Sequence, residues 1–122
     1  MVHLTAEGLD AFLRQHPQAR VLDVRFAFER EHGDPPATHH VPWLRRDWTP
    51  NPDFLQHVLQ SLSPRDYVLV LCHRGDCSHH AAALLEAAGF RHVYNLLGGY
   101  EDIRNTLSAS TPSGFAATRF SY

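Results

Sequence analysis

Residues 68–103 read VLVLCHRGDCSHHAAALLEAAGFRHVYNLLGGYEDI, and the order of segments in this stretch decides the fold. Residues 67–71 are continuously apolar, which is typical of a strand buried on both faces. The alanine- and leucine-rich residues 78–88 predict a helix that ends at Gly89. Residues 92–96 predict another strand. Buried strand, helix and strand in this order indicate a parallel α/β unit.

The rest of the chain continues the alternation. Thr5 has the side chain of an N-cap for a helix from Ala6 to about His16, which Pro17 ends. The other expected elements are a buried strand over 21–24, a helical turn over 28–32, an edge strand over 39–42, a helix over 53–62 and a last helix over 100–107. We therefore expect an α/β fold: a small, mostly parallel central sheet with helices on both faces.

The length of 122 residues is that of one domain. We assign it to residues 1–107, followed by a C-terminal tail, 108–122, that is packed or partly disordered. Its aromatic side chains suit anchoring on the body or on a partner. They are Phe115, Phe120 and Tyr122.

The composition excludes several classes of protein. Apolar residues make up 43% and charged residues 20%, and the formal net charge is -2, so nothing favours binding to nucleic acid. No apolar run approaches the roughly 18 residues that span a bilayer, and the first residues do not resemble a secretory signal. We expect a cytoplasmic protein without a nucleic-acid or membrane partner.

Cys72 directly follows the strongest strand and opens a short loop that ends at Cys77. In parallel sheets, ligands bind beyond the carboxyl ends of the strands, so we expect the chemistry in this loop. The thiolate is the reactive form of cysteine. The start of a helix offers unpaired N–H groups and a partial positive charge, both of which favour an anion. The pattern therefore indicates a reactive thiol.

The other residues of the loop also affect the stability of an anionic sulfur on Cys72. Gly75 allows a positive φ, with which the backbone amides can turn inward around an anion. Ser78 has the side chain of an N-cap. His73 and Arg74 add positive charge, and Asp76 removes some. We expect part of Cys72 to be ionised at neutral pH, in a loop that can also hold a persulfide.

This stretch resembles the active-site half of rhodanese-like domains. That family has an apolar strand, a catalytic cysteine that opens a six-residue loop, a helix led by serine or alanine, a Gly-Phe turn, an Asn-Leu strand end and a Gly-Gly pair. The matching positions are Cys72 to Cys77, Ser78, Gly89-Phe90, Asn95-Leu96 and Gly98-Gly99. Upstream, VLDVR at 21–25 and GDPPATHHVPW at 33–43 also resemble family segments.

Some positions depart from the family pattern. Asp34 stands where histidine is usual, Ala37-Thr38 replaces Gly-Ala, and Ile103 stands where tryptophan is common. These positions bear on structure. Cys77 occupies a loop position where many small members carry arginine, which weakens the positive rim of the loop; Arg74 can partly compensate.

The resemblance implies a sulfurtransferase that takes a sulfane sulfur from a donor such as thiosulfate onto Cys72 and passes it to a thiophilic acceptor. It implies Cys72 as the catalytic nucleophile and needs no cofactor or metal. The implied substrate-binding residues are His73, Arg74, Gly75, Asp76, Cys77 and Ser78. The expected partners are a small anionic sulfur donor and a possible protein thiol acceptor. Asp23 and Arg25 are expected to be structural, and Trp43 and Trp48 to pack in the core.

Four alternatives remain. A rhodanese-like phosphatase is disfavoured, because it needs a histidine before the cysteine and a longer loop closed by arginine. A redox or thiol-transfer protein would use Cys77 to resolve Cys72 as a disulfide. A zinc site would combine both cysteines with His73, His79 or His80, but the spacing fits no familiar signature. The fourth alternative is a non-catalytic binding module on the same scaffold. The presence of Cys72 argues against it, because such a module does not need a nucleophilic cysteine.

Overall fold

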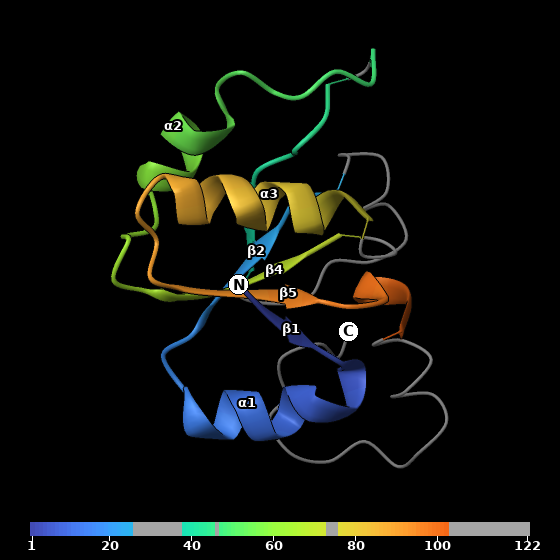
Figure 1. Ribbon diagram of the computed structural model, residues 1–122, viewed down its shortest axis with the longest axis vertical. Helices are drawn as coiled ribbons and strands as arrows, with labels where there is room; N and C mark the ends of the chain where they lie inside the picture. Colours follow the sequence, from blue (N-terminus) through green and yellow to red (C-terminus); the bar gives the residue numbers. More distant parts are fainter. Residues whose placement is uncertain (26–37, 46, 73–75, 103–122) are drawn as a thin grey trace.

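A computed structural model describes residues 1–25, 38–45, 47–72 and 76–102. A five-stranded sheet occupies its centre in the order β1-β5-β4-β2-β3, and every neighbouring pair is parallel (Figure 1). The strands are β1 Val2–Leu4, β2 Arg20–Asp23, β3 Thr38–His40, β4 Tyr67–Leu71 and β5 His92–Leu96. The predicted parallel sheet is confirmed.

Helices cover both faces of the sheet, as predicted. In Figure 1, α2 and α3 lie on one face and α1 lies on the other. The helices bounded within the described residues are the short 3-10 helix η1 Ala6–Gly8, α1 Leu9–Gln15, α2 Phe54–Leu59 and α3 Asp76–Ala87, and residues 99–102 are also helical. Within the described ranges, each helix is too short or too polar to cross a bilayer.

The central strand β4 divides its side chains between two apolar clusters. Val68 and Val70 belong to the cluster under α2 and α3, whereas Leu69 and Leu71 belong to the cluster under α1. All four side chains are buried, which confirms the prediction of a strand covered on both faces. Successive side chains of a strand point to opposite faces, and Cys72 accordingly joins the cluster of Val68 and Val70. The thiol therefore faces α2 and α3.

Helix ends follow the local sequence signals. The first helix begins as a 3-10 turn, where the Thr5 hydroxyl accepts a hydrogen bond from the Gly8 amide at 3.3 Å. Helix α3 ends at Ala87, and Gly89 follows it with a φ of +100°, while the Phe90 amide donates to the Leu85 carbonyl at 3.0 Å. Both the predicted N-cap and the predicted C-terminal glycine are thus confirmed.

Two sequence-based assignments were wrong. Strand β1 was not predicted, because a three-residue VHL segment has no periodicity, and its pairing with β5, in which His3 lies opposite Asn95, involves a distant part of the chain. Helix α3 begins at Asp76, so Ser78 lies within its first turn and is not the N-cap. Its buried hydroxyl bonds to strand β5 instead. The predicted turn over 28–32, most of the helix over 100–107 and the tail over 108–122 lie outside the described residues.

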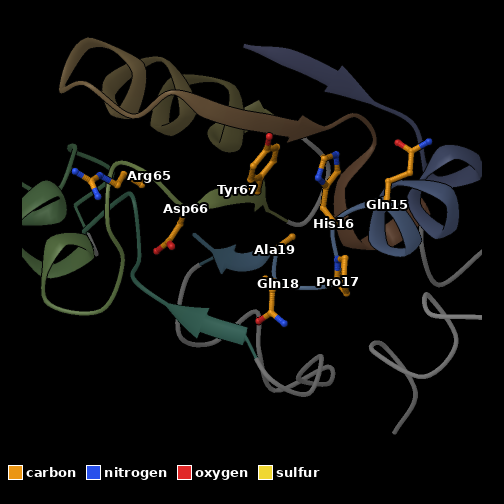
Figure 2. A pocket seen from close by; sticks show the side chains of 8 residues that line it. All are labelled: Gln15, His16, Pro17, Gln18, Ala19, Arg65, Asp66 and Tyr67. Carbon is orange, nitrogen blue, oxygen red and sulfur yellow. The ribbon is translucent and has the colours of Figure 1, made fainter.

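A hollow of about 310 Å³ lies near Tyr67, at the amino end of β4 (Figure 2). The ring of Tyr67, at the start of β4, stacks there on His16 with a centroid distance of 4.3 Å and on His92 with 4.1 Å. The lining residues are Gln15, His16, Pro17, Gln18, Ala19, Arg65, Asp66 and Tyr67. Tyr67 and Cys72 are five residue steps apart along the strand, roughly 17 Å, so the hollow is not part of the cysteine's surroundings.

A buried ion pair fixes the carboxyl end of β2. The Arg25 guanidinium donates to the Asp23 carboxylate through Nε and Nη2, at distances of 2.8 to 3.1 Å. The guanidinium also lies 4.5 Å from the centre of the Tyr100 ring. Both charged side chains are buried, and they neutralise one another. Their pairing accords with the structural role expected from the sequence.

We expect Asp23→Ala to lower the free energy of unfolding by about 3–5 kcal/mol, because it leaves a buried guanidinium without its carboxylate. Asp10→Ala is the control, since it breaks the more exposed Asp10–Arg14 pair on α1 and should cost about 0.5 kcal/mol or less. Urea denaturation measures both. Equal losses would contradict a stabilising role specific to the buried pair.

Candidate active site

Cys72 lies at the carboxyl end of the central strand, one residue beyond β4. Its backbone carbonyl accepts a hydrogen bond from the Tyr100 amide at 2.8 Å, which ties it to the segment after β5. The residue is only 4% exposed, and both Cys72 and Cys77 are free thiols. The thiol thus has a fixed backbone position and a largely desolvated surrounding.

Two buried polar side chains adjoin the thiol. The Cys72 sulfur lies 3.6 Å from the Ser78 hydroxyl, which in turn donates to the Asn95 side-chain oxygen at 2.6 Å. Ser78 comes from the first turn of α3 and Asn95 from β5. Buried polar groups in an apolar core need such partners. Here the hydrogen bond between Ser78 and Asn95 also places the Ser78 oxygen beside the Cys72 sulfur.

The hydrogen-bond direction in this pair is defined. A hydroxyl carries one proton, and that of Ser78 is directed at Asn95. Ser78 therefore accepts from the Cys72 thiol rather than donating to it.

The remaining predicted site residues are placed as follows. Asp76 begins α3, and Cys77 follows it as a half-buried side chain that packs against the cluster containing Cys72. His73, Arg74 and Gly75 lie outside the described residues. The structure therefore brings Ser78 to the thiol and Cys77 to its cluster, and leaves the rest of the predicted loop undescribed.

The two tryptophans differ from one another. Trp43 packs its ring edge-on against Phe54, with 5.2 Å between the centroids, as expected of a core residue. Trp48 was expected in the core and is instead 68% exposed. Its φ is +68°, its backbone N–H donates a hydrogen bond to the Arg45 carbonyl at 2.9 Å, and its side chain is presented to solvent. At Trp48 the geometry of the turn therefore outweighs the tendency of a tryptophan side chain to pack in the core.

Asn95 was quoted in the family pattern but not recognised as a neighbour of the cysteine, and the contact of its side-chain amide with His3 was not predicted. A signal for Asn95 existed: one amide side chain stands within the apolar run VYNLL of a buried strand. A buried amide in such a run needs a polar partner on a neighbouring element. No comparable signal exists for His3, since its strand was not predicted.

Among the residues that the structure describes, no three His, Cys, Asp or Glu side chains are grouped so as to hold a metal ion. The His79 ring instead stacks on His3, with 5.8 Å between centroids. The zinc alternative thus has no ligand set in the described ranges, and His73 lies outside them.

A desolvated thiol at the carboxyl edge of a parallel sheet, four residues before the start of a helix, defines an α/β protein with a candidate nucleophilic cysteine. Comparison with known families agrees with that class. Residues 5–106 match the family described as rhodanese-like domain. The chain belongs to the rhodanese-like domain family.

Curated relatives give the same family. Rhodanese-like domain-containing protein 17 of Arabidopsis thaliana is 38% identical over 65% of this chain and 54% of the relative. Chloroplastic thiosulfate sulfurtransferase 16 of the same plant is 36% identical over 66% of this chain and 70% of the relative. Thiosulfate sulfurtransferase GlpE of Pseudomonas fluorescens is 47% identical over 38% of this chain and 43% of the relative. The chain therefore spans about half the length of some relatives, and the names support a sulfurtransferase family.

Solved structures confirm the fold. The rhodanese-like domain from Anabaena sp. superimposes with a TM-score of 0.71 at 23% identity and covers 94% of this chain and 87% of that one. A rhodanese-like domain protein from Staphylococcus aureus gives 0.68 at 23% identity and covers 84% of this chain and 91% of that one. At this identity the likeness concerns the arrangement of strands and helices.

We expect Ser78→Ala and Asn95→Ala each to lower the free energy of unfolding by about 1–3 kcal/mol, because each removes the buried hydrogen bond between the two side chains. The double variant should lose less than the sum of the two, with a coupling of about 0.5–3 kcal/mol. Urea denaturation of the four proteins measures this coupling. Ser61→Ala, at an exposed serine, is the control and should stay within about 0.5 kcal/mol of wild type. Strict additivity would show that the two side chains do not stabilise one another.

Proposed function

We propose that this chain transfers a sulfane sulfur from a small anionic donor, such as thiosulfate, to a thiophilic acceptor through a persulfide on Cys72. The observation that carries the proposal is the position of Cys72: its thiol lies at the carboxyl edge of the central strand and against the first turn of α3. Relatives named thiosulfate sulfurtransferase support the choice of reaction.

The first transfer loads the enzyme. The Cys72 thiolate attacks the outer sulfur of thiosulfate, the S–S bond of thiosulfate breaks, and sulfite leaves with the bonding electron pair. Cys72 then carries a persulfide whose outer sulfur is anionic. This step needs no metal, because the leaving group is already stable as an anion.

The second transfer removes the outer sulfur from Cys72. A nucleophile such as cyanide or a thiolate attacks the outer sulfur of the persulfide, and the Cys72 thiolate leaves with the electron pair of the S–S bond. Each half-reaction ends before the other begins, so ping-pong kinetics follow. The cysteine returns to its starting state.

Helix α3 suits an anionic intermediate. Its first-turn amides have no partner within the helix, and the helix dipole adds a partial positive charge at that end. The helix has 12 residues and begins at Asp76, close in sequence to Cys72. A preorganised set of such donors stabilises an anion without moving during the reaction. We assign the attraction of the anionic donor to His73 and Arg74.

The low exposure of Cys72 favours small reactants. At 4% exposure the residue offers little surface to a large molecule, whereas thiosulfate, cyanide and low-molecular-weight thiols need only a narrow opening. A protein thiol acceptor requires that the loop after Cys72 admit a partner's side chain. Small anions are therefore the first donors and acceptors to test.

Intact-mass spectrometry after thiosulfate treatment tests the proposal. Wild type should gain the mass of one sulfur atom, which cyanide then removes, because the persulfide forms on Cys72. Cys72→Ser should gain nothing and lose activity by roughly 10³-fold or more. Cys77→Ser is the matched control and should load and unload like wild type.

Sulfur transfer that survives in Cys72→Ser would overturn the proposal. Loss of transfer in Cys77→Ser, together with the loss of two thiols per molecule on mild oxidation, would instead favour the redox alternative.

A further inference from the structure

We propose that Tyr100 is a positioning residue for Cys72: its backbone N–H restrains the Cys72 carbonyl, and its ring, which packs against the buried Arg25 guanidinium, keeps that N–H in place. The inference rests on the proposed function and concerns the same cysteine. Its basis is a backbone hydrogen bond of 2.8 Å and a distance of 4.5 Å between the guanidinium carbon and the centre of the Tyr100 ring.

The backbone at the end of β4 is held by two neighbouring segments. The Leu71 carbonyl accepts a hydrogen bond from the Val24 amide at 2.9 Å, and the next carbonyl, that of Cys72, accepts one from the Tyr100 amide at 2.8 Å. A peptide group is planar, so a bond to the Cys72 carbonyl also restrains the peptide group with which the loop begins. The Tyr100 amide therefore restrains the backbone that carries the reactive sulfur.

The side chain of Tyr100 is fixed on the other face of the sheet. It is buried in the cluster under α1, whereas Cys72 belongs to the cluster under α2 and α3. The Arg25 guanidinium lies over the Tyr100 ring and is itself bound by both carboxylate oxygens of Asp23. A cation over an aromatic face attracts the ring. Because the two side chains lie on opposite faces, Tyr100 acts on Cys72 through the backbone.

The turn before Tyr100 has a demanding backbone conformation. Gly98 has a φ of +76° and Gly99 a φ of +63°, and side chains other than glycine adopt such values only with strain. A Cβ added at Gly98 would also collide with the Asp102 side chain. The turn therefore leads the chain along a defined path from the end of β5 to the end of β4.

The position of the sulfur matters for the proposed first transfer. The Cys72 sulfur has to approach the donor along the line of the S–S bond that breaks, and a misplacement of about 1 Å slows such a step by roughly 100-fold. Loss of one backbone restraint leaves the other restraints in place. We therefore expect a smaller effect, of roughly 10-fold, when the Tyr100 hydrogen bond is removed.

The test removes the N–H of Tyr100 alone. Tyr100 is incorporated as its α-hydroxy acid, which replaces the backbone amide by an ester and keeps the side chain. The same replacement at Phe90 is the matched control. The Phe90 amide donates a comparable backbone hydrogen bond, to the Leu85 carbonyl at 3.0 Å, beyond the C-terminal end of α3.

Intact-mass spectrometry follows the loading of sulfur from thiosulfate in a single turnover. In the Tyr100 ester the limiting rate constant should fall by roughly 10-fold, whereas the thiosulfate concentration at half of that rate should change by less than about 2-fold. A misplaced sulfur slows the attack and does not alter the attraction of the donor. The Phe90 ester should load at the wild-type rate. Equal slowing of the two esters, or a change confined to the thiosulfate concentration, would overturn the inference.

Side-chain variants test the ring separately. Tyr100→Leu removes the ring that faces Arg25 and should slow loading by at least roughly 5-fold, whereas Tyr100→Phe keeps the ring and should load within about 2-fold of wild type. Phe12→Leu is the control, because Phe12 is buried in the same cluster under α1 and packs against the rings of His16 and Tyr94. It should lower the urea midpoint without slowing the loading.

The control variant also defines a contrary result. If Phe12→Leu slows loading as much as Tyr100→Leu, a general loosening of the core explains the effect, and the proposed role of Tyr100 is wrong. The two esters decide the question if Tyr100→Leu does not fold.

The two proposals can fail separately, because alkylation of Cys72 by iodoacetamide does not require sulfur transfer. In a Cys77→Ser background the Tyr100 ester should be alkylated more slowly than the Phe90 ester. A wild-type protein that gains no sulfur from thiosulfate, while its esters show this difference, would overturn the proposed function alone. A protein that forms the persulfide, while its two esters load and alkylate equally, would overturn this inference alone.

Discussion

The hydrogen bond from Ser78 to Asn95 joins the first turn of α3 to strand β5, and the position of the Cys72 sulfur depends on it. Both side chains are buried, so neither can exchange its partner for water without cost. The bond holds the start of α3 against the sheet at the point where β4 ends. A reactive thiol, a helix start and a polar contact are thereby brought to one place.

The same geometry explains how an apolar cluster can contain a nucleophile. Cys72 belongs by strand periodicity to the cluster under α2 and α3, where a cysteine side chain packs like a small apolar residue. An anionic sulfur needs donors, and the neighbouring helix start and the Ser78 hydroxyl are the groups that can supply them. The Cys72 thiol thus lies close to groups that can stabilise its anionic form.

The sequence was sufficient for elements with strong local signals. Strands β4 and β5 were predicted at their observed residues, and Gly89 marked the end of α3, because apolar runs and a left-handed glycine act locally. Cys72 followed from its place after the central strand. Strand β1 was missed because its stability comes from pairing with a distant segment. Ser78 was taken for an N-cap because its true partner, Asn95, adjoins it only in the folded chain.

The central claim is that Cys72 carries the transferred sulfur beside the start of α3. A crystal structure of thiosulfate-treated protein tests it most directly. Our account predicts an added sulfur atom on Cys72 Sγ, beside the first turn of α3. An unmodified Cys72 in crystals whose Cys77 carries the added sulfur would contradict the account.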